Sequence, residues 1–314
     1  MGGIWQGGNG LSADSNGYVY AMTGNGKYAT SPYTTYYAES FLQLTAGIGA
    51  ADPNAYYRDP NWNALDTGDT DLGSGGPVQL SGLTVPALIG GGKQGYLYTI
   101  GTSNMLPITK FFATYSPDSG ITDWSGAACN TQGTSEIKGG AAYYGGFAGG
   151  FTHVAYVWGE HDYVKAFQVT SAGSVAFDGN TLSPTLCGTP GAPGGSSGGT
   201  CGAILSVGTS VGGVGCGGPG GMLSVSSDGA YAGTGIVWAS HQKQDAETNP
   251  SASGRLIALD AADLNKELWD SDQVGGNSIA SLAKFVPPTV ANGRVYMATF
   301  DGMVRVYGLL TNLR

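Results

Sequence analysis

The residues best suited to chemistry are two carboxylates, Asp69 and Asp71, which stand two positions apart in the sequence. Side chains at such positions of an extended loop face the same side, so the pair could bind one cation. A solvated loop end built from Asx-turns uses the same residue types and remains open as the alternative.

Histidine and serine motifs offer two further candidates. His153 and His161 are predicted on adjacent strands, with Glu160 and Asp162 beside the second, and could form a metal or acid–base site. A blade-edge histidine with a satisfied hydrogen bond is the favoured interpretation. Ser210 lies in a G-x-S-x-G pattern, but a nucleophile elbow needs a helix to follow, and the glycine-rich continuation does not supply one.

Composition indicates the elements that must position these residues. The 314 residues include 56 glycines and 18 tyrosines, with only 13 Lys and Arg and a net charge of −9. Abundant glycine breaks helices, and the aromatic content argues against disorder. Nucleic-acid binding needs a basic surface that this composition lacks, and no apolar run is long enough for a transmembrane helix. The composition predicts an all-β chain with many turns.

A divergent internal repeat predicts the arrangement of the strands. Strand–turn–strand segments with Asn-Gly or Asp-Gly turns occur at 11–24, 223–233 and 288–299. A third strand is predicted at 95–100, 162–167, 254–260 and 302–307, and a fourth is clearest at 267–270. A repeated four-stranded antiparallel unit is typical of a β-propeller.

About five such units are visible, and we expect a single propeller domain over 1–314. They are longer than the roughly 40–50 residues of ordinary propeller repeats, which predicts long loops at 27–70, 101–137, 178–216 and 240–253. The Gly/Ser-rich range 178–216 is predicted to be a loop insertion. The abrupt start, with no visible signal peptide, favours a propeller of seven or eight blades completed by N-terminal blades or by another subunit. A small propeller closed by the five units alone is the alternative.

The four cysteines indicate whether the protein is in an oxidising or a reducing cellular compartment. Cys187, Cys201 and Cys216 lie in or beside the predicted insertion, and Cys129 precedes it. An even count without a C-x-x-C motif favours two disulfides, in any of three pairings, in an extracellular or periplasmic protein. Free thiols remain the alternative.

Three segments resemble the quinoprotein family, whose propellers bind pyrroloquinoline quinone (PQQ). They are Gly3-Ile-Trp5 with its following Thr23-Gly-Asn25-Gly hairpin end, Asp69-Thr-Asp71-Leu-Gly-Ser-Gly-Gly-Pro77, and Gly91-Gly-Lys93-Gln-Gly-Tyr-Leu-Tyr98. Their order is similar to the middle of a PQQ-dependent alcohol dehydrogenase. The Asp-Leu-Gly-Ser-Gly-Gly-Pro form looks more like a poorly characterised branch of that family.

The resemblance implies a role for each matched residue. Trp5 would form the floor under the planar quinone, and Lys93 would bond its carbonyl oxygens. Asn25 and Asp71 would contribute calcium ligands. Asp71, or next Asp69, would act as the base that removes the hydroxyl proton of the substrate. A blade-packing Trp, a turn Asn and an exposed turn Lys are the structural alternatives.

Departures from the family keep two functions open. The vicinal Cys-Cys that covers the quinone is absent, and so is the C-x-x-C-H motif of an attached haem. One function is a PQQ- and calcium-dependent dehydrogenase of alcohols, polyols or sugars, or a degenerate relative. The other is a non-catalytic extracellular propeller that binds a carbohydrate or protein partner through aromatic loops, for which the tyrosines are candidates: Tyr28, Tyr33, Tyr36, Tyr37, Tyr56 and Tyr57.

Overall fold

The structure is a computed structural model of the whole chain. It describes residues 2–26, 37–45, 55–113, 115–116, 133–134, 136–145, 153–160, 162–175, 204–207, 219–229, 231, 233–243, 246, 249, 251–273 and 275–308. The four cysteines, His161 and Ser210 lie outside these residues, so the predictions made for them are untested.

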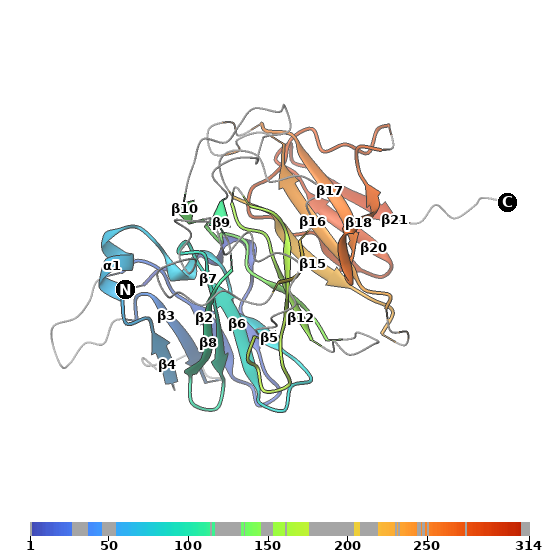
Figure 1. Cartoon of the computed structure of the whole chain (residues 1–314). Helices are drawn as coiled ribbons and strands as arrows, with labels where there is room; N and C mark the ends of the chain where they lie inside the picture. The colour runs from blue at the N-terminus through green and yellow to red at the C-terminus, as the bar shows by residue number, and fades with distance from the viewer. Residues whose placement is uncertain are drawn as a thin grey trace.

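Five antiparallel sheets follow one another along the chain (Figure 1). The first contains β1 Ser12–Ala13, β2 Val19–Met22, β3 Ser40–Leu44 and β4 Ala55–Arg58. The second contains β5 Val78–Leu80, β6 Ala87–Gly91, β7 Tyr96–Gly101 and β8 Leu106–Phe112. In both, each strand pairs with the next strand in sequence, as hairpin connections require.

The remaining sheets repeat this order. The third contains β11 Ala142–Tyr144, β12 Val154–Val157, β13 Lys165–Gln168 and β14 Ile204–Val207. The fourth contains β15 Met222–Ser226, β16 Ile236–Gln242, β17 Gly254–Asp260 and β18 Asp263–Asp270. The fifth has three described strands, β19 Thr289–Ala291, β20 Arg294–Ala298 and β21 Val304–Gly308. A separate two-stranded ladder joins β9 Tyr115–Ser116 to β10 Gly133–Thr134.

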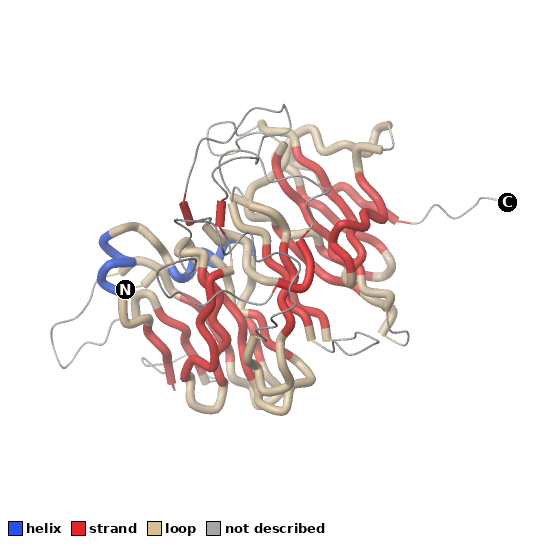
Figure 2. The backbone as a smooth tube through the Cα atoms, in the orientation of Figure 1, coloured by secondary structure: helices blue, strands red, loops and turns tan. Residues whose placement is uncertain are grey.

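Short helical segments lie at one end of the first two sheets (Figure 2). They are η1 Gln6–Gly8, α1 Trp62–Thr67 and η2 Leu72–Ser74. We call this end, which also carries the β2–β3 and β6–β7 connections, the site face. None of the helices in the described part of the chain is both long and apolar enough to cross a membrane.

The sheets pack face to face in chain order, and their first strands lie side by side. Strand β1 contacts β5, β5 contacts β11, β11 contacts β15, and β15 contacts β19. Neighbouring residues of a central strand therefore serve two different cores, because side chains alternate between the faces of a sheet. Leu97 packs between the second and third sheets, whereas Tyr98 packs between the first and second. The expected all-β propeller of four-stranded antiparallel units is confirmed.

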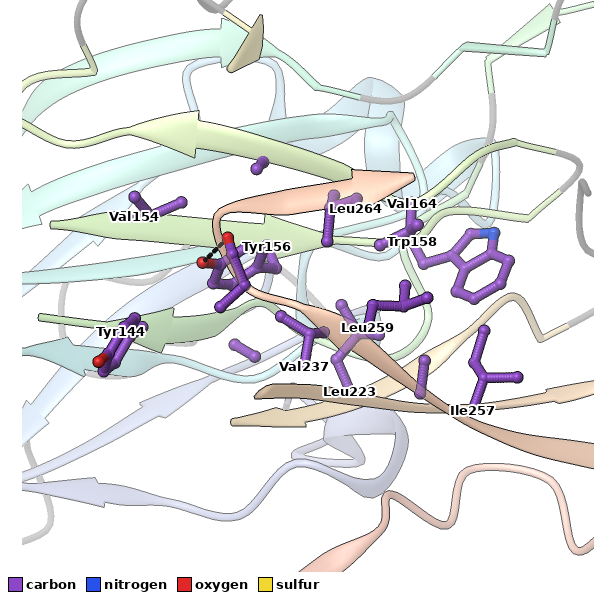
Figure 3. Packing of buried hydrophobic residues seen from close by; sticks show 14 residues of the cluster. Tyr144, Val154, Tyr156, Trp158, Val164, Leu223, Val237, Ile257, Leu259 and Leu264 are labelled. Atoms are coloured by element: carbon purple, nitrogen blue, oxygen red, sulfur yellow. Dashed lines mark hydrogen bonds between the residues drawn. The ribbon is translucent and has the colours of Figure 1, made fainter. Parts of the chain in front are cut away.

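The core between the third and fourth sheets shows how closely these faces fit (Figure 3). Tyr156 on β12 is fully buried, and its hydroxyl donates a 2.7 Å hydrogen bond to the carbonyl of Ala261. Burial raises the pKa of Tyr156 well above its ordinary range, so the hydroxyl stays a donor. The bond joins two sheets at the turn between β17 and β18.

Tyr156→Phe is therefore expected to lower the free energy of unfolding by about 1–2 kcal/mol, since the buried Ala261 carbonyl loses its donor. Urea unfolding measures the change. Tyr231→Phe, at a 66% exposed tyrosine, is the control and should leave stability unchanged. Equal stability of the Tyr156 variant and the wild-type protein would contradict the role given to this bond.

The fifth sheet differs because one of its faces is open. The last strand, β21, alternates exposed and half-buried residues, and Val304 and Val306 are 62% and 51% exposed. The opposite face packs on the fourth sheet through Val295 and Met297. Among the described residues, each middle sheet has a hydrophobic core on both faces, whereas the fifth sheet has one only on the face toward the fourth sheet.

Most of the predicted strands are present, and the departures have local causes. The predicted third strands correspond to β7, β13, β17 and β21. The strand expected near 230–233 begins only at Ile236, because the Thr234 hydroxyl bonds the carbonyls of Asp228 and Tyr231 and lengthens the turn. The predicted loops are not all loop: 27–70 contains β3, β4 and α1, 101–137 contains β8, and 178–216 contains β14.

Candidate functional site

Four connections on the site face carry the candidate residues. Trp5 caps the start of η1, and Asn25 follows β2. Asp69 and Asp71 lie between α1 and η2, where Asp71 is the residue before η2. Lys93 lies in the short turn between β6 and β7. Each side chain thus sits just beyond a strand or helix end, which holds it at the rim of the sheets.

All five predicted site residues come together. The backbone N–H of Asn25 donates to Asp71 Oδ1 at 2.8 Å, and the Asn25 side-chain amide donates to Asp69 Oδ1 at 2.7 Å. Lys93 Nζ lies 2.7 Å from Asp71 Oδ2 and 3.2 Å from Asp69 Oδ2. The same ammonium lies 5.8 Å from the centre of the Trp5 ring.

The two aspartates have different surroundings. Asp71 is 5% exposed, whereas the side chain of Asp69 is 77% exposed. Burial lowers the pKa of Lys93, but its hydrogen bonds and charge interactions with Asp71 and Asp69 outweigh this effect and raise the pKa above its ordinary value. Lys93 is therefore charged, and Asp71 is the buried half of a closed ion pair.

Backbone packing around this ion pair is tight. A Cβ atom on Gly24 would lie 2.3 Å from Asp71 Oδ1, and one on Gly92 would lie 2.2 Å from the Asp71 carbonyl oxygen. Only glycine allows the two loops to approach so closely. These contacts hold Asp71 at the junction of the first and second sheets.

One functional candidate, Glu39, has no signal in the sequence. It is fully buried just before β3, and its Oε2 accepts a 2.6 Å hydrogen bond from the N–H of Leu72, while Oε1 is buried without a partner. Burial, opposed by the Leu72 bond and reinforced by the charges of Asp71, Asp66 and Asp59, raises the pKa of Glu39 to about 8. Glu39 is thus a neutral acid at pH 7 directly beneath the Asp71 loop.

The arrangement does not fit a calcium ion. Calcium takes six to eight oxygen ligands, but Asp71 already accepts one N–H bond and contacts an ammonium. Asn25 Oδ1 is buried without a hydrogen-bond partner and is a single available oxygen. Among the described residues, no group of three or more carboxylate, histidine or cysteine side chains could hold a metal ion.

A planar anionic quinone is also poorly matched. Trp5 is 41% exposed and offers a stacking surface, and Lys93 stands beside it. The quinone is a polycarboxylate, however, and the described side chains at this place are mainly acidic: Lys93 faces Asp69 and Asp71, and Asp66 bonds the N–H of Gly26 nearby. We therefore derive no reaction step through either group.

His153, just before β12, contacts a tyrosine hydroxyl outside this cluster. His153 is 7% exposed, and its Nδ1 lies 2.5 Å from the hydroxyl of Tyr143, which in turn donates to the carbonyl of Ser81. Burial lowers the pKa of His153. Tyr37 packs edge-on against the exposed Tyr56 at 4.9 Å, while Tyr28, Tyr33 and Tyr36 lie outside the described residues.

Comparison with known proteins gives distant fold likenesses. The sequence matches no family model and no curated protein. Among solved structures, BamB from Moraxella catarrhalis is 11% identical, with a TM-score of 0.38, over 96% of this chain and 70% of that one. The quinohemoprotein alcohol dehydrogenase ADHIIG from Pseudomonas putida HK5 is 14% identical, with a TM-score of 0.34, over 95% of this chain and 39% of that one.

A third structure, the computationally designed Ika8 protein, is 11% identical, with a TM-score of 0.34, over 95% of this chain and 70% of that one. The chain spans about two fifths of the length of the alcohol dehydrogenase. Likenesses at these scores do not distinguish one activity from another.

Proposed function

We propose that this chain is a non-catalytic β-propeller binding module, and that its contact surface lies on the site face around Trp5. The observation that carries the proposal is that both carboxylate oxygens of Asp71 already contact donors of the protein. Its Oδ1 accepts the N–H of Asn25, and its Oδ2 contacts Lys93 at 2.7 Å. A general base needs an accessible lone pair directed at the substrate proton, whereas Asp71 is 5% exposed and each of its oxygens already contacts a donor of the protein.

The same kind of ion pair recurs at this end of other sheets, which supports a structural role. In the connection from β12 to β13, fully buried Lys165 pairs with fully buried Asp162. Next to the end of β16, Lys243 pairs with Asp272 at 2.5 Å. Lys93 occupies the corresponding connection of the second sheet, so it belongs to a series of cations that fasten strand ends.

The competing function is a PQQ- and calcium-dependent oxidoreductase acting on alcohols, polyols or sugars. The convergence of its five implied residues supports this candidate. It would require Lys93 to leave Asp71, and it would require further oxygen ligands and cations that the described residues do not supply.

Reconstitution tests the choice between these functions. The full chain is incubated with PQQ and Ca²⁺, and quinone absorbance, thermal unfolding and dye reduction with an alcohol panel are recorded. We expect no quinone absorbance after desalting and no calcium-dependent rise in Tm. Retained quinone with alcohol-dependent dye reduction would overturn the proposal.

Compartment and partners belong to the same proposal. The even number of cysteines favours an oxidising compartment, so we propose an extracellular or periplasmic location with a carbohydrate or protein partner. The open face of the fifth sheet, where Val304 and Val306 are exposed, is consistent with further blades or another subunit completing the propeller.

A further inference from the structure

Trp5 is an exposed aromatic side chain held in a fixed orientation. It is 41% exposed, its ring meets Phe285 edge-on with centroids 6.0 Å apart, and Lys93 Nζ lies over it. The next residue, Gln6, is 3% exposed and accepts the N–H of Met22, which ties the chain to β2. A buried anchor beside an exposed ring makes a rigid platform with little conformational entropy to lose on binding.

Backbone strain is concentrated around this platform. Six described non-glycine residues have positive φ, and three of them lie close to Trp5 in the chain or in space. Gln6, at φ 45°, follows Trp5, Phe285, at φ 61°, contacts its ring, and Asp69, at φ 52°, contacts the lysine that lies over the ring. Such conformations persist only where surrounding contacts enforce them, and they collect at binding sites. Phe285 is held in this way against the Trp5 ring, and Asp69 is held against Lys93.

Asp69 provides hydrogen-bonding capacity next to Lys93, the ammonium that lies over the ring. Its Oδ1 accepts one bond from Asn25 and its Oδ2 contacts Lys93, yet the side chain is 77% exposed. A carboxylate can accept about four hydrogen bonds, so lone pairs of Asp69 still face solvent.

Charge around the ring selects the class of ligand. The ammonium of Lys93 already lies 5.8 Å from the ring centre, which disfavours a second cation there. The carboxylates of Asp69 and Asp71 disfavour an anion. A neutral ligand with a flat apolar face and hydroxyl donors satisfies both conditions.

We propose that the Trp5 ring is the stacking platform for a pyranose ring of a neutral carbohydrate, and that Asp69 accepts hydrogen bonds from its hydroxyl groups. This inference rests on the proposed binding function and specifies its ligand. The C–H face of the sugar covers the exposed part of the indole, and the carboxylate fixes the orientation of the ring.

The test uses the full chain and defined hexasaccharides. Maltohexaose, cellohexaose, xylohexaose and chitin hexamer are the neutral probes, polygalacturonate hexamer is the anionic probe and chitosan hexamer is the cationic probe. Binding is measured by calorimetry and by saturation-transfer NMR. We expect at least one neutral hexamer to bind, and both charged probes to bind at least tenfold more weakly.

Variants locate the binding. Trp5→Ala should weaken binding at least tenfold, Trp5→Phe should retain it within about threefold, and Asp69→Asn should weaken it several-fold because an amide accepts fewer bonds. Tyr231→Ala removes an exposed aromatic ring elsewhere and should bind as the wild-type protein does. Unchanged unfolding curves confirm that each variant is folded.

No binding of any neutral hexamer, preferential binding of a charged probe, or equal binding by Trp5→Ala would overturn this inference. Failure of the sugar titration together with failure of PQQ loading would remove the carbohydrate ligand alone. Successful PQQ loading with dye reduction would remove the binding function itself.

Discussion

Lys93→Met is expected to lower the free energy of unfolding by about 2–4 kcal/mol, because it leaves Asp71 buried without its cation. Asp71 is 5% exposed, and the Lys93 side chain is 12% exposed. Removing one partner of a buried pair leaves the desolvation penalty of the other in place. The N–H of Asn25 still bonds Asp71 Oδ1, which keeps the expected loss below that of a deeply buried pair.

A double-mutant cycle measures this interaction. Asp71→Asn keeps an oxygen for the Asn25 N–H and removes the charge, so the Lys93→Met/Asp71→Asn variant should be more stable than Lys93→Met alone. Lys266 pairs with Asp260 at 2.8 Å, but its side chain is 61% exposed, so Lys266→Met is the matched control and should change stability far less. Additive effects at Lys93 and Asp71 would show that the pair does not fasten the two loops.

The same variants bear on function. If Lys93 only holds the two loops together, Lys93→Met is less stable than the wild-type protein, and neither protein retains PQQ. If Lys93 bonds a quinone, its loss abolishes cofactor retention that the wild-type protein shows. The stability and loading measurements therefore separate a structural lysine from a cofactor-binding lysine.

The strands could be predicted because their signals are local. Asn292-Gly293 forms the turn between β19 and β20, with Asn292 at φ 51° and Gly293 at φ 69°, as an Asn-Gly hairpin requires. The turn after β15 shows the limit. Asp228-Gly229 is present, but side-chain bonds from Thr234 extend the loop, and those depend on a residue outside the turn motif.

The candidate site could be predicted only as a set of residues. Trp5, Asn25, Asp71 and Lys93 come from four connections, and resemblance to a known family places them near one another. The pairing of Lys93 with both aspartates follows from the approach of the β6–β7 turn to the Asp71 loop, where Gly24 and Gly92 permit contact. No local pattern indicates that approach.

The sequence gives no sign of Glu39 because its raised pKa results mainly from burial. In the sequence it is a single acid between Ala38 and Ser40, before an apolar strand. The tertiary fold buries it completely and gives it the N–H of Leu72, the first residue of η2. A residue whose pKa depends on tertiary contacts leaves no trace in spacing or composition.

Glu39→Gln is expected to flatten the pH dependence of stability between about pH 4.5 and pH 8. The pKa of Glu39 is raised to about 8 from 4.5, so the folded state holds a proton that the unfolded chain releases. The stabilisation is full below about pH 4.5 and is lost as pH rises through 8. Between pH 5 and pH 8 this linkage amounts to about 3 kcal/mol.

A buried histidine acts in the opposite direction at lower pH. Burial lowers the pKa of His241 to about 4, so protonation of the unfolded chain reduces stability as pH falls below about 6.5. The difference between wild-type and Glu39→Gln proteins cancels this effect. Urea unfolding at pH 5, 6.5 and 8 should show the variant gaining about 3 kcal/mol relative to wild type across the range.

Gln can keep the acceptor for the Leu72 N–H, so the variant should fold at every pH in the series. Asp228→Asn, at an exposed position in the β15–β16 turn, is the control and should run parallel to the wild-type protein. Parallel profiles for Glu39→Gln and wild type would mean that Glu39 is ionised in the fold and places a negative charge beside Asp71. A flattened profile would establish that Glu39 is protonated at neutral pH, so that its burial beneath the Asp71 loop adds no negative charge next to the Lys93–Asp71 ion pair.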